Sequence, residues 1–394
     1  MKHLFNLDPD IHFLNHGSFG ACPKPVFDAY QAWQRELERQ PVAFLGRRIT
    51  GLLAESRGAL GAFLHVAPDD LVYFPNPTTA LNMVARSFVS GCADDGQAPY
   101  LRAGDEILTT DHEYGALDRT WDYVCKLSGA RYIQHPVPLP LPEPDAFVEH
   151  FWAGVTPATR IIFISHITSP TALNFPAAEI CRRARDASIL TVVDGAHAPG
   201  QIDLNLASVG ADIYAGACHK WLCAPKGAAF LYARKEVQQL LTPLVVSWGW
   251  EAEAQGASQF VDWHEWQGTR DLSAYLTVPA AIRFQQEHDW GRRRTACHAL
   301  AAETRDRILA LTGLPPICGN DAFGQMFSAL LPPCDAEALK ARLWDERRVE
   351  IPVLRRGGDV LARVSFQAYN DRADADALLT GLEALLPQVA RAHA

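Results

Sequence analysis

The chain has 394 residues, 48% of them hydrophobic and 21% charged, a composition that suits a globular protein with a large domain and a smaller one. Its net charge of -9 is spread without a basic stripe, so nucleic acid is not an expected partner. No signal-peptide pattern opens the chain, and no apolar run is long enough to cross a membrane. We therefore expect a soluble, cytoplasmic protein.

Short apolar runs alternate with amphipathic segments over the first two thirds of the chain. The apolar runs are expected to form strands buried on both faces, at residues 71–74, 105–110, 131–136, 160–165, 189–194, 212–216 and 228–233. Between them, residues 78–90 and 177–187 carry apolar side chains at helical spacing. This alternation predicts a mostly parallel α/β sheet.

After about residue 279 the pattern changes. Longer helices are expected at 280–311 and 335–347, with short strands within 322–331 and 360–369. The leading segment has no sheet partner near it in sequence. We therefore expect a large domain at 17–279 and a smaller α+β domain made of 1–16 and 280–394.

An acid and a lysine lie at or just beyond the ends of neighbouring predicted strands, where ligands bind in open parallel sheets. Asp194 ends one strand, and Lys220 follows the next. A carboxylate against a pyridine nitrogen and an amine for a Schiff base are what pyridoxal 5'-phosphate (PLP) chemistry requires. Asp194 also has the alternative of capping its Asp-Gly turn, and Lys220 that of lying in solvent. Lys226, in a Pro-Lys-Gly turn, is the competing lysine.

Two further strand ends carry polar or aromatic groups. Residues 76–79, Asn-Pro-Thr-Thr, open a predicted helix, which favours either a phosphate site or a simple helix cap. Residues 111–114, Asp-His-Glu-Tyr, offer a ring that stacks on a cofactor, or else form a surface turn. Cys218, His219 and Cys223 lack a second ligand pair at zinc-finger spacing, so no metal is predicted.

Taken in order, the motifs resemble the class V aminotransferase family, and within it the isopenicillin N epimerase-like branch. The resemblance covers nearly the whole chain and is carried by NHGSFG (15–20), NPTTALN (76–82), DHEYGA (111–116), SHITSPTALNFP (165–176), VDGAHAPGQ (193–201), CHKWLCAPKGAAFL (218–231), GTRD (268–271) and RVSFQAYN (363–370).

The resemblance implies fold type I of PLP enzymes, with a mostly parallel seven-stranded sheet in the large domain, and a homodimer whose active sites are shared between subunits. It implies that Lys220 forms the Schiff base and is the catalytic lysine, together with Asp194 at the pyridinium nitrogen. His197 would hydrogen-bond the phenolic oxygen. His112 would stack on the ring as a catalytic residue, with Tyr114 as a competitor for that place.

The phosphate and the substrate also have implied ligands. Thr78, Thr79 and His219 match phosphate ligands, joined by Thr269 of the partner subunit. Arg363 matches the arginine that binds the substrate α-carboxylate, for which a planar guanidinium is well shaped. Further substrate-side candidates are Asn15, His16 and Tyr114.

The implied reaction begins at Cα of an amino acid, through an external aldimine and a carbanion. Reprotonation on the opposite face gives epimerase or racemase chemistry, which the resemblance favours. Loss of a β-substituent would give a carbon–sulfur lyase for cysteine conjugates or sulfoxides, and reprotonation at the cofactor carbon an aminotransferase. Cysteine desulfurase chemistry is disfavoured, because residues 350–361 contain no cysteine.

Two other classes of protein remain as alternatives. A nucleotide-binding α/β protein would need a Gly-x-Gly-x-x-Gly turn after an early strand, and the chain has none. A PLP-free binding protein would lack the cofactor's absorbance. The sequence does not identify the substrate side chain, and the cluster Trp248, Trp250, Trp263 and Trp266 is expected either in the substrate pocket or in an interface.

Overall fold

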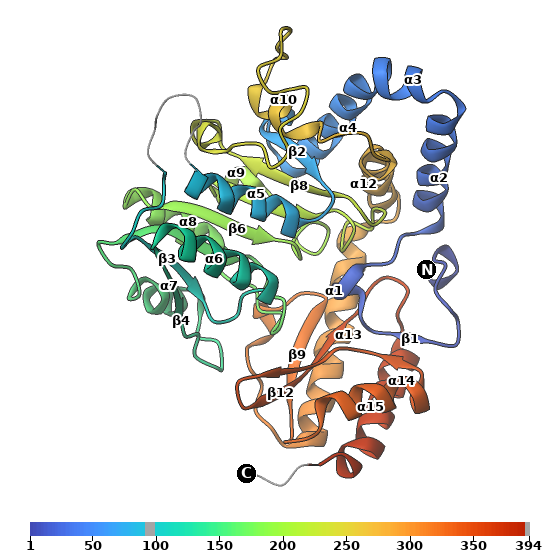
Figure 1. Cartoon of the computed structure of the whole chain (residues 1–394). Helices are drawn as coiled ribbons and strands as arrows, with labels where there is room; N and C mark the ends of the chain where they lie inside the picture. The colour runs from blue at the N-terminus through green and yellow to red at the C-terminus, as the bar shows by residue number, and fades with distance from the viewer. Residues whose placement is uncertain (91–98, 391–394) are drawn as a thin grey trace.

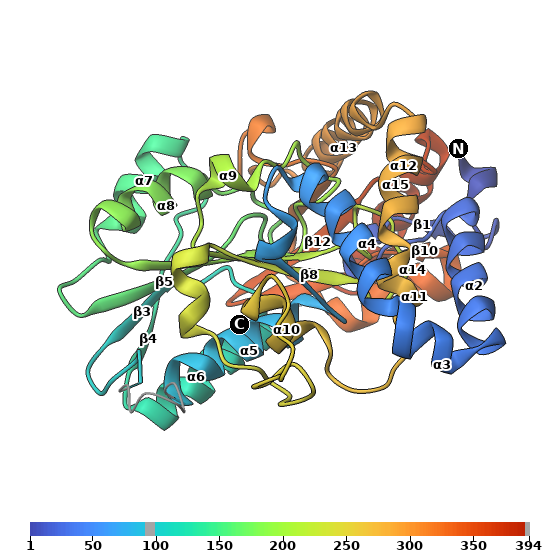
Figure 2. The same ribbon diagram turned by 90° about the horizontal axis from the view of Figure 1, so that it is seen from above.

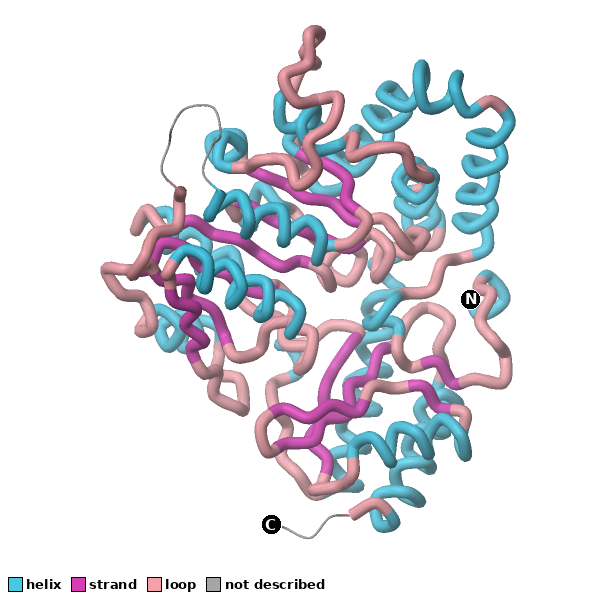
Figure 3. The backbone as a smooth tube through the Cα atoms, viewed as in Figure 1, coloured by secondary structure: helices cyan, strands magenta, loops and turns pink. Residues whose placement is uncertain are grey.

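The structure is a computed structural model that describes residues 1–90 and 99–390. The chain forms two lobes, an upper one built on a large sheet and a lower one that contains the C-terminal helices (Figure 1). Their sheets are separate, as the two groups of strands in Figure 3 show. Within the described residues, no helix is both long and apolar enough to cross a membrane.

The large sheet has seven strands, and each corresponds to one of the apolar runs predicted from sequence. In sheet order they are β2 (Leu71–Phe74), β8 (Ala229–Ala233), β7 (Ile213–Ala217), β6 (Leu190–Gly195), β5 (Thr159–Ser165), β3 (Glu106–Thr110) and β4 (Arg131–His135). β8 runs antiparallel to both of its neighbours, β2 and β7, and the other six strands share one direction. The prediction that all are buried on both faces is wrong for β4, an edge strand with partly exposed side chains.

Helices cover both faces of this sheet. In Figure 2, α5 (Pro77–Ser90) and α6 (Gly115–Ser128) lie on one side, and α7 (Pro144–Trp152) and α8 (Ala177–Asp186) on the other. Each side has its own apolar core: Leu81 and Trp121 belong to one, Phe147 and Ile180 to the other. Burial on both faces explains why the central strands read as continuous apolar runs.

Additional helices join the large lobe. They are α1 (His16–Phe19), α2 (Lys24–Arg39), α3 (Pro41–Ala43), the π-helix η2 (Phe44–Arg48), α4 (Ile49–Leu64), α9 (Leu206–Val209), α10 (Gln259–Glu265), α11 (Ser273–Leu276) and α12 (Val278–Glu287). Along the whole described chain, the short 3-10 helices are η1 (Lys2–Leu4), η3 (Pro68–Asp70), η4 (Lys235–Leu240), η5 (Asn320–Ala322) and η6 (Leu386–Gln388).

The small lobe is α+β. Its antiparallel sheet has the order β11 (Val353–Arg356), β12 (Asp359–Ser365), β9 (Met326–Leu331), and its helices are α13 (Trp290–Thr312), α14 (Ala336–Arg347) and α15 (Arg372–Leu385). The leading segment reaches this lobe, because β1 (His12–Phe13) pairs with β10 (Val349–Glu350). The exact domain limits, 17–279 against 1–16 with 280–394, stay a prediction.

The helix expected at 280–311 is two helices. The chain leaves the helical conformation at His288 and Asp289, where Asp289 has a left-handed φ of 50°. Packing explains the interruption: α12 lies against α2 and α4 in the large lobe, whereas α13 lies against β9 in the small one. The chain therefore changes direction where it passes between the lobes.

Candidate active site

A cavity of about 550 Å³ lies at the carboxyl ends of the strands of the large sheet. Its lining comes from α1, the start of α5, the loop before α6, the ends of β5 and β6, the loop after β7, and β12 of the small lobe. This is an ordinary volume for a small-molecule site. Both lobes contribute, so the cavity depends on how they pack.

Lys220 lines this cavity, in the turn that connects β7 to β8. Burial lowers the pKa of its amine to about 8, because the ammonium form loses hydration, although the nearby Asp194 carboxylate opposes the shift. The competing Lys226 is not part of the lining, and its Nζ donates a hydrogen bond to the Gly20 carbonyl at 2.9 Å. Of the two lysines, only Lys220 can react with a molecule in the cavity.

Asp194 lies near the end of β6, on the strand beside β7, and also lines the cavity. One carboxylate oxygen, Oδ1, accepts a hydrogen bond from the Ala196 amide at 2.9 Å. Burial raises the pKa of Asp194, while that hydrogen bond and the charge of Lys220 lower it. The turn-capping alternative and the functional one are thus compatible, because the turn uses Oδ1 alone.

His197 connects Lys220 to the core. Its Nε2 lies 3.1 Å from Lys220 Nζ, and its Nδ1 accepts a hydrogen bond from the indole Nε1 of Trp221 at 3.2 Å. The ring is buried, and burial together with the charge of Lys220 lowers the pKa of His197 well below its ordinary value. The imidazole is therefore neutral at physiological pH.

The start of α5 supplies hydroxyl groups. Thr78 and Thr79 line the cavity, and Asn76 caps the helix, its Oδ1 accepting from the Thr79 amide at 2.8 Å and from the Thr79 hydroxyl at 3.0 Å. A helix N-terminus with hydroxyls suits an anion such as phosphate. His219 also lines the cavity, and its Nδ1 donates to the Ala228 carbonyl at 3.0 Å.

Arg363, on β12, brings the only guanidinium that lines the cavity as the structure describes it. It is 5% exposed, and its two terminal nitrogens donate to the Ser169 carbonyl at 2.7 Å and to the Ser18 hydroxyl at 2.8 Å. Burial lowers its pKa to about 10, so it remains charged near neutrality. Such a fixed guanidinium is suited to a carboxylate.

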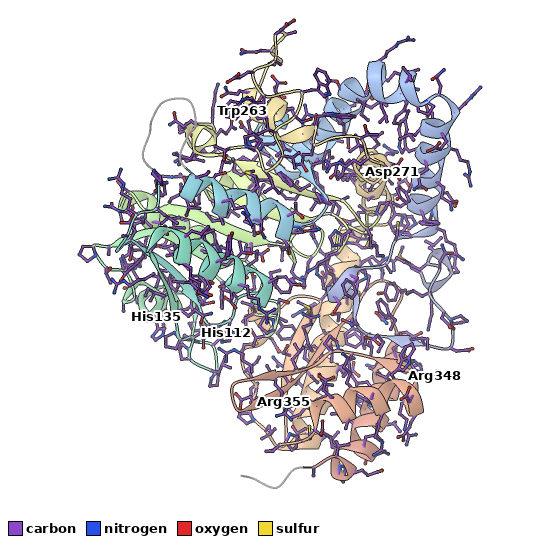
Figure 4. The ribbon with its side chains drawn as sticks, in the orientation of Figure 1. His112, His135, Trp263, Asp271, Arg348 and Arg355 are labelled. Carbon is purple, nitrogen blue, oxygen red and sulfur yellow. The ribbon has the colours of Figure 1, made fainter. Side chains whose placement is uncertain are left out.

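The loop before α6 differs from expectation. His112 is fully buried and does not line the cavity: its Nδ1 is 2.7 Å from the Thr171 hydroxyl, and its ring contacts Phe175. Figure 4 shows it at the edge of the large lobe that faces the small one. Tyr114 does line the cavity and is 45% exposed. The turn directs His112 inward in this structure, and its stacking on the cofactor and catalytic role stay a prediction.

The N-terminal candidates are also outside the lining. Asn15 is buried, with its Nδ2 donating to Glu350 Oε1 at 2.9 Å. His16 is fully buried; its Nε2 lies 3.0 Å from the Lys220 carbonyl, and its Nδ1 lies 2.9 Å from the Tyr369 hydroxyl. These contacts hold both side chains within the protein, and direct contact of Asn15 and His16 with substrate stays a prediction.

Thr269 does not line this cavity either, and its side chain is exposed. A contribution of Thr269 across a subunit interface stays a prediction.

Of the tryptophan cluster, none lines the cavity in the described part of one chain, and Trp263 lies at the far end of the large lobe from His112 (Figure 4). Trp248 is 87% exposed.

Sequence reasoning missed a carboxyl group beside the site. Glu113 is buried and accepts hydrogen bonds from the hydroxyls of Thr110 and Ser165, both at 2.6 Å. Burial raises its pKa to about 8, and the charge of Asp194 adds to the shift. Ser165 lines the cavity and pairs with Asp194 across the strands. Ser165 ends a predicted strand, and this position is the sequence feature that could have indicated the hydrogen-bonded pair of Ser165 and Glu113.

Comparison with known proteins identifies the family. The model for class-V aminotransferases matches residues 18–378. The chain belongs to the class-V aminotransferase family. It is 39% identical to the isopenicillin N epimerase of Amycolatopsis lactamdurans, over 96% of each chain. It is 28% identical to a probable chloroplastic L-cysteine desulfhydrase of Arabidopsis thaliana, over 96% of this chain and 84% of that protein.

A solved structure has the same fold. The cysteine desulfurase CsdA of Escherichia coli superposes with a TM-score of 0.81 at 20% identity, covering 98% of each chain. The predicted fold type I of PLP enzymes, with its mostly parallel seven-stranded sheet, is confirmed. The prediction that disfavours cysteine desulfurase chemistry gains no support, because desulfurases and desulfhydrases are among the similar proteins.

Membership of the family makes PLP the cofactor of this chain. The side chains around the cavity fit that group. Lys220 offers an amine of lowered pKa for its aldehyde, Asp194 a carboxylate for its pyridine nitrogen, and the hydroxyls of Thr78 and Thr79 donors for its phosphate. No group of three or more potential metal ligands occurs in the described residues.

Proposed function

We propose that this chain acts at Cα of an amino-acid substrate and that its reaction is epimerisation. The observation that carries the proposal is the cavity itself, in which an amine, a carboxylate and a guanidinium meet at Lys220, Asp194 and Arg363. The likeness to an isopenicillin N epimerase over 96% of both chains favours epimerisation among the reactions that this set permits.

Each of these groups has a role in the proposal. When bound, PLP withdraws electrons from Cα and acidifies its proton. Arg363 holds the substrate carboxylate, and Lys220 anchors the cofactor and then removes the Cα proton, which a neutral amine of pKa about 8 can do. Asp194 sustains the positive charge of the pyridine nitrogen. His197 directs one ring nitrogen to the side of the cavity where Lys220 Nζ lies.

Epimerisation also needs a proton donor on the opposite side of Cα. Of the two candidates from sequence, His16 is enclosed behind the Lys220 backbone, whereas Tyr114 lines the cavity. Tyr114 also lies within electrostatic range of Arg363, the proposed carboxylate ligand. We assign the second proton transfer to the Tyr114 hydroxyl.

The reaction is tested by incubating the holoprotein with L-amino acids and S-substituted cysteine sulfoxides in D₂O. We expect one substrate to give its D-isomer with deuterium at Cα, and Lys220→Ala to abolish this product. Accumulation of pyruvate with a sulfur-containing product would establish a β-lyase instead, and a 2-oxo acid an aminotransferase. If none of the substrates exchanges its Cα proton, action at Cα is contradicted for them all.

Tyr114 has a sharper test. Tyr114→Phe removes the hydroxyl and retains the ring, so we expect formation of the D-isomer to fall by a factor of about 10² while deuterium still enters the L-isomer through Lys220. Tyr123→Phe is a matched control, because Tyr123 is 46% exposed and lies outside the cavity lining. Equal loss of exchange and of D-isomer would show that Tyr114 is not the second proton donor.

Carbon–sulfur β-lyase activity is the second candidate, favoured by the likeness to a cysteine desulfhydrase. It would use the same proton removal by Lys220, followed by loss of a β-substituent.

Subunit association belongs to the proposal too: a homodimer would let the exposed Thr269 of the partner subunit join the phosphate ligands. Light scattering, with Thr269→Ala tested for cofactor affinity, checks this arrangement.

A further inference from the structure

Lys220 is followed directly by a tryptophan whose indole reaches back to the site. Trp221 is fully buried, and its Nε1 donates to His197 Nδ1 at 3.2 Å. Its position is fixed from several directions: the His16 ring lies 4.9 Å away between centroids, and Gln285 Nε2 donates to the Trp221 carbonyl at 2.8 Å. The indole is thus held rigidly against the imidazole.

The chemistry of the two rings determines where the proton of His197 lies. An indole nitrogen can only donate, so the Nδ1 atom that accepts from it carries no proton. A neutral imidazole has one N–H, which must then be on Nε2. That nitrogen is 3.1 Å from Lys220 Nζ.

The same reasoning extends to the lysine. With its proton on Nε2, His197 is a donor toward Lys220, and only a neutral amine has the lone pair to accept. An ammonium at Lys220 would need Nε2 as an acceptor as well, which would leave the imidazole with no proton and a negative charge. The two contacts are therefore mutually consistent only with an uncharged lysine.

We propose that Trp221 is a positioning residue that fixes the Nε2–H tautomer of His197, and thereby favours the neutral form of the Lys220 amine in the apoprotein and keeps an N–H donor at the cavity for the cofactor. The lowered pKa of Lys220 agrees with this arrangement. The significance of this relay for catalysis rests on the proposed role of Lys220, but the tautomer itself does not.

Other charges act on these groups and must stay constant in a test. His197 faces Lys220, Arg363, His219 and His16, and Lys220 also faces Asp194. Substitution of Trp221 alters none of them. Without the indole donor, His197 can carry its proton on Nδ1 and accept from an ammonium at Lys220. The charged lysine then gains a hydrogen bond.

The first test measures the tautomer in apoprotein labelled with ¹⁵N-histidine, using long-range ¹H–¹⁵N correlation and His197→Gln to assign the signal. Above pH 8, where the Lys220 amine is neutral, we expect wild-type His197 to be protonated at Nε2 alone, and Trp221→Phe to give a mixture of both tautomers. A proton on Nδ1 in the wild type would overturn the proposal. This measurement decides by itself if Trp221→Phe does not fold, and it is independent of which reaction the enzyme catalyses.

The second test follows Lys220. The rate of pyridoxal attachment to apoprotein, trapped with borohydride and mapped to Lys220, is measured against pH. We expect Trp221→Phe to move the midpoint upward by about one pH unit, the effect of one hydrogen bond. Trp121→Phe is the matched control, since Trp121 is fully buried, lies in α6 and has no hydrogen-bond partner for its indole in the described structure.

A double substitution separates positioning from general damage. If Trp221 acts through His197, adding Trp221→Phe to His197→Gln will leave the Lys220 midpoint unchanged. An upward shift of the same size in both backgrounds would mean that the indole affects Lys220 by another route, and the relay would be rejected.

Discussion

The two walls of the cavity are built in different ways. The large-lobe wall consists of Asp194, His197 and Lys220, which lie at or just after the ends of adjacent parallel strands and contact one another or interact by charge. The opposite wall is Arg363 on β12, held by Ser18 and Ser169 from two distant parts of the chain. One wall depends on local sequence and strand order, and the other depends on how the two lobes dock.

The largest effect should come from removing the amine of the first wall. We expect Lys220→Ala to lower turnover by a factor on the order of 10³ or more, because both the cofactor anchor and the proposed base are lost. The absorbance of lysine-bound cofactor should disappear as well. Lys226→Ala, six positions along, is the control and should retain both. Normal turnover in Lys220→Ala would remove the basis for the first wall.

A smaller effect is expected from the second wall. Arg363→Ala should reduce kcat/KM by between about tenfold and a hundredfold, the cost of lost hydrogen bonds to a charged carboxylate. Arg363→Lys, which retains the charge but not the planar fork, should recover only part of this loss. Cofactor affinity, measured by equilibrium dialysis, should not change. A fall in cofactor affinity equal to the fall in kcat/KM would show that the walls are not separable.

These two walls also differ in how far sequence alone could predict them. Asp194 and Lys220 follow predicted strands, and parallel order places such residues together, so their proximity could be inferred from the pattern. Arg363 was assigned only by resemblance, since nothing in its own strand indicates which lobe it faces. Its hydrogen-bond partners Ser18 and Ser169 could not be predicted from sequence, because they contact Arg363 only after the lobes pack.

Sequence alone also could not predict the direction in which a side chain points within a turn. His112 and Tyr114 are two residues apart after β3, yet the first packs against Phe175 and the second lines the cavity. His16 likewise turned inward, to the carbonyl of Lys220. The conformation of the turn and the space available in the core determine whether a side chain points inward, and residue type alone predicts neither.

The pH dependence of Lys220 sharpens the comparison, because it responds to both walls. The neutral amine is the reactive form, so attachment of pyridoxal to apoprotein should rise with pH and level off above about 8, not near the ordinary lysine value. Asp194 raises this pKa and Arg363 lowers it. We therefore expect Asp194→Asn to move the midpoint down and Arg363→Ala to move it up. Shifts of opposite sign to these would contradict the arrangement.

Linkage gives the same pKa a consequence for stability. Between about pH 8 and the unfolded-state value of 10.5, the unfolded chain binds a proton at Lys220 that the folded apoprotein does not. The contribution of Lys220 to the free energy of unfolding therefore rises with pH across that window. Below pH 8, burial of the charged ammonium destabilises the folded apoprotein by the full amount. Comparing the unfolding free energies of apoprotein and Lys220→Met at pH 7.5 and 10 isolates it: their difference should shrink at the higher pH.

The smallest effect concerns the junction of the lobes. Arg356, at the end of β11, forms an ion pair with Asp111 of the large lobe, and Asp111 Oδ1 also accepts from the Val137 amide at 2.8 Å. Because the pair is partly exposed, we expect Arg356→Ala to change the unfolding free energy by less than about 1 kcal/mol. Urea unfolding measures this change.

Arg356→Ala nevertheless tests the docking of the second wall. The ion pair joins the small lobe to the loop that carries Tyr114, and Arg363 lies on β12, the strand paired with β11. If lobe docking positions Arg363, KM should rise modestly and the Lys220 midpoint should move slightly upward, because a displaced Arg363 lowers that pKa less. Arg342→Ala, which removes an ion pair within α14, serves as the control. A shift in the Lys220 midpoint without a change in KM would mean that the docking contact serves the first wall instead.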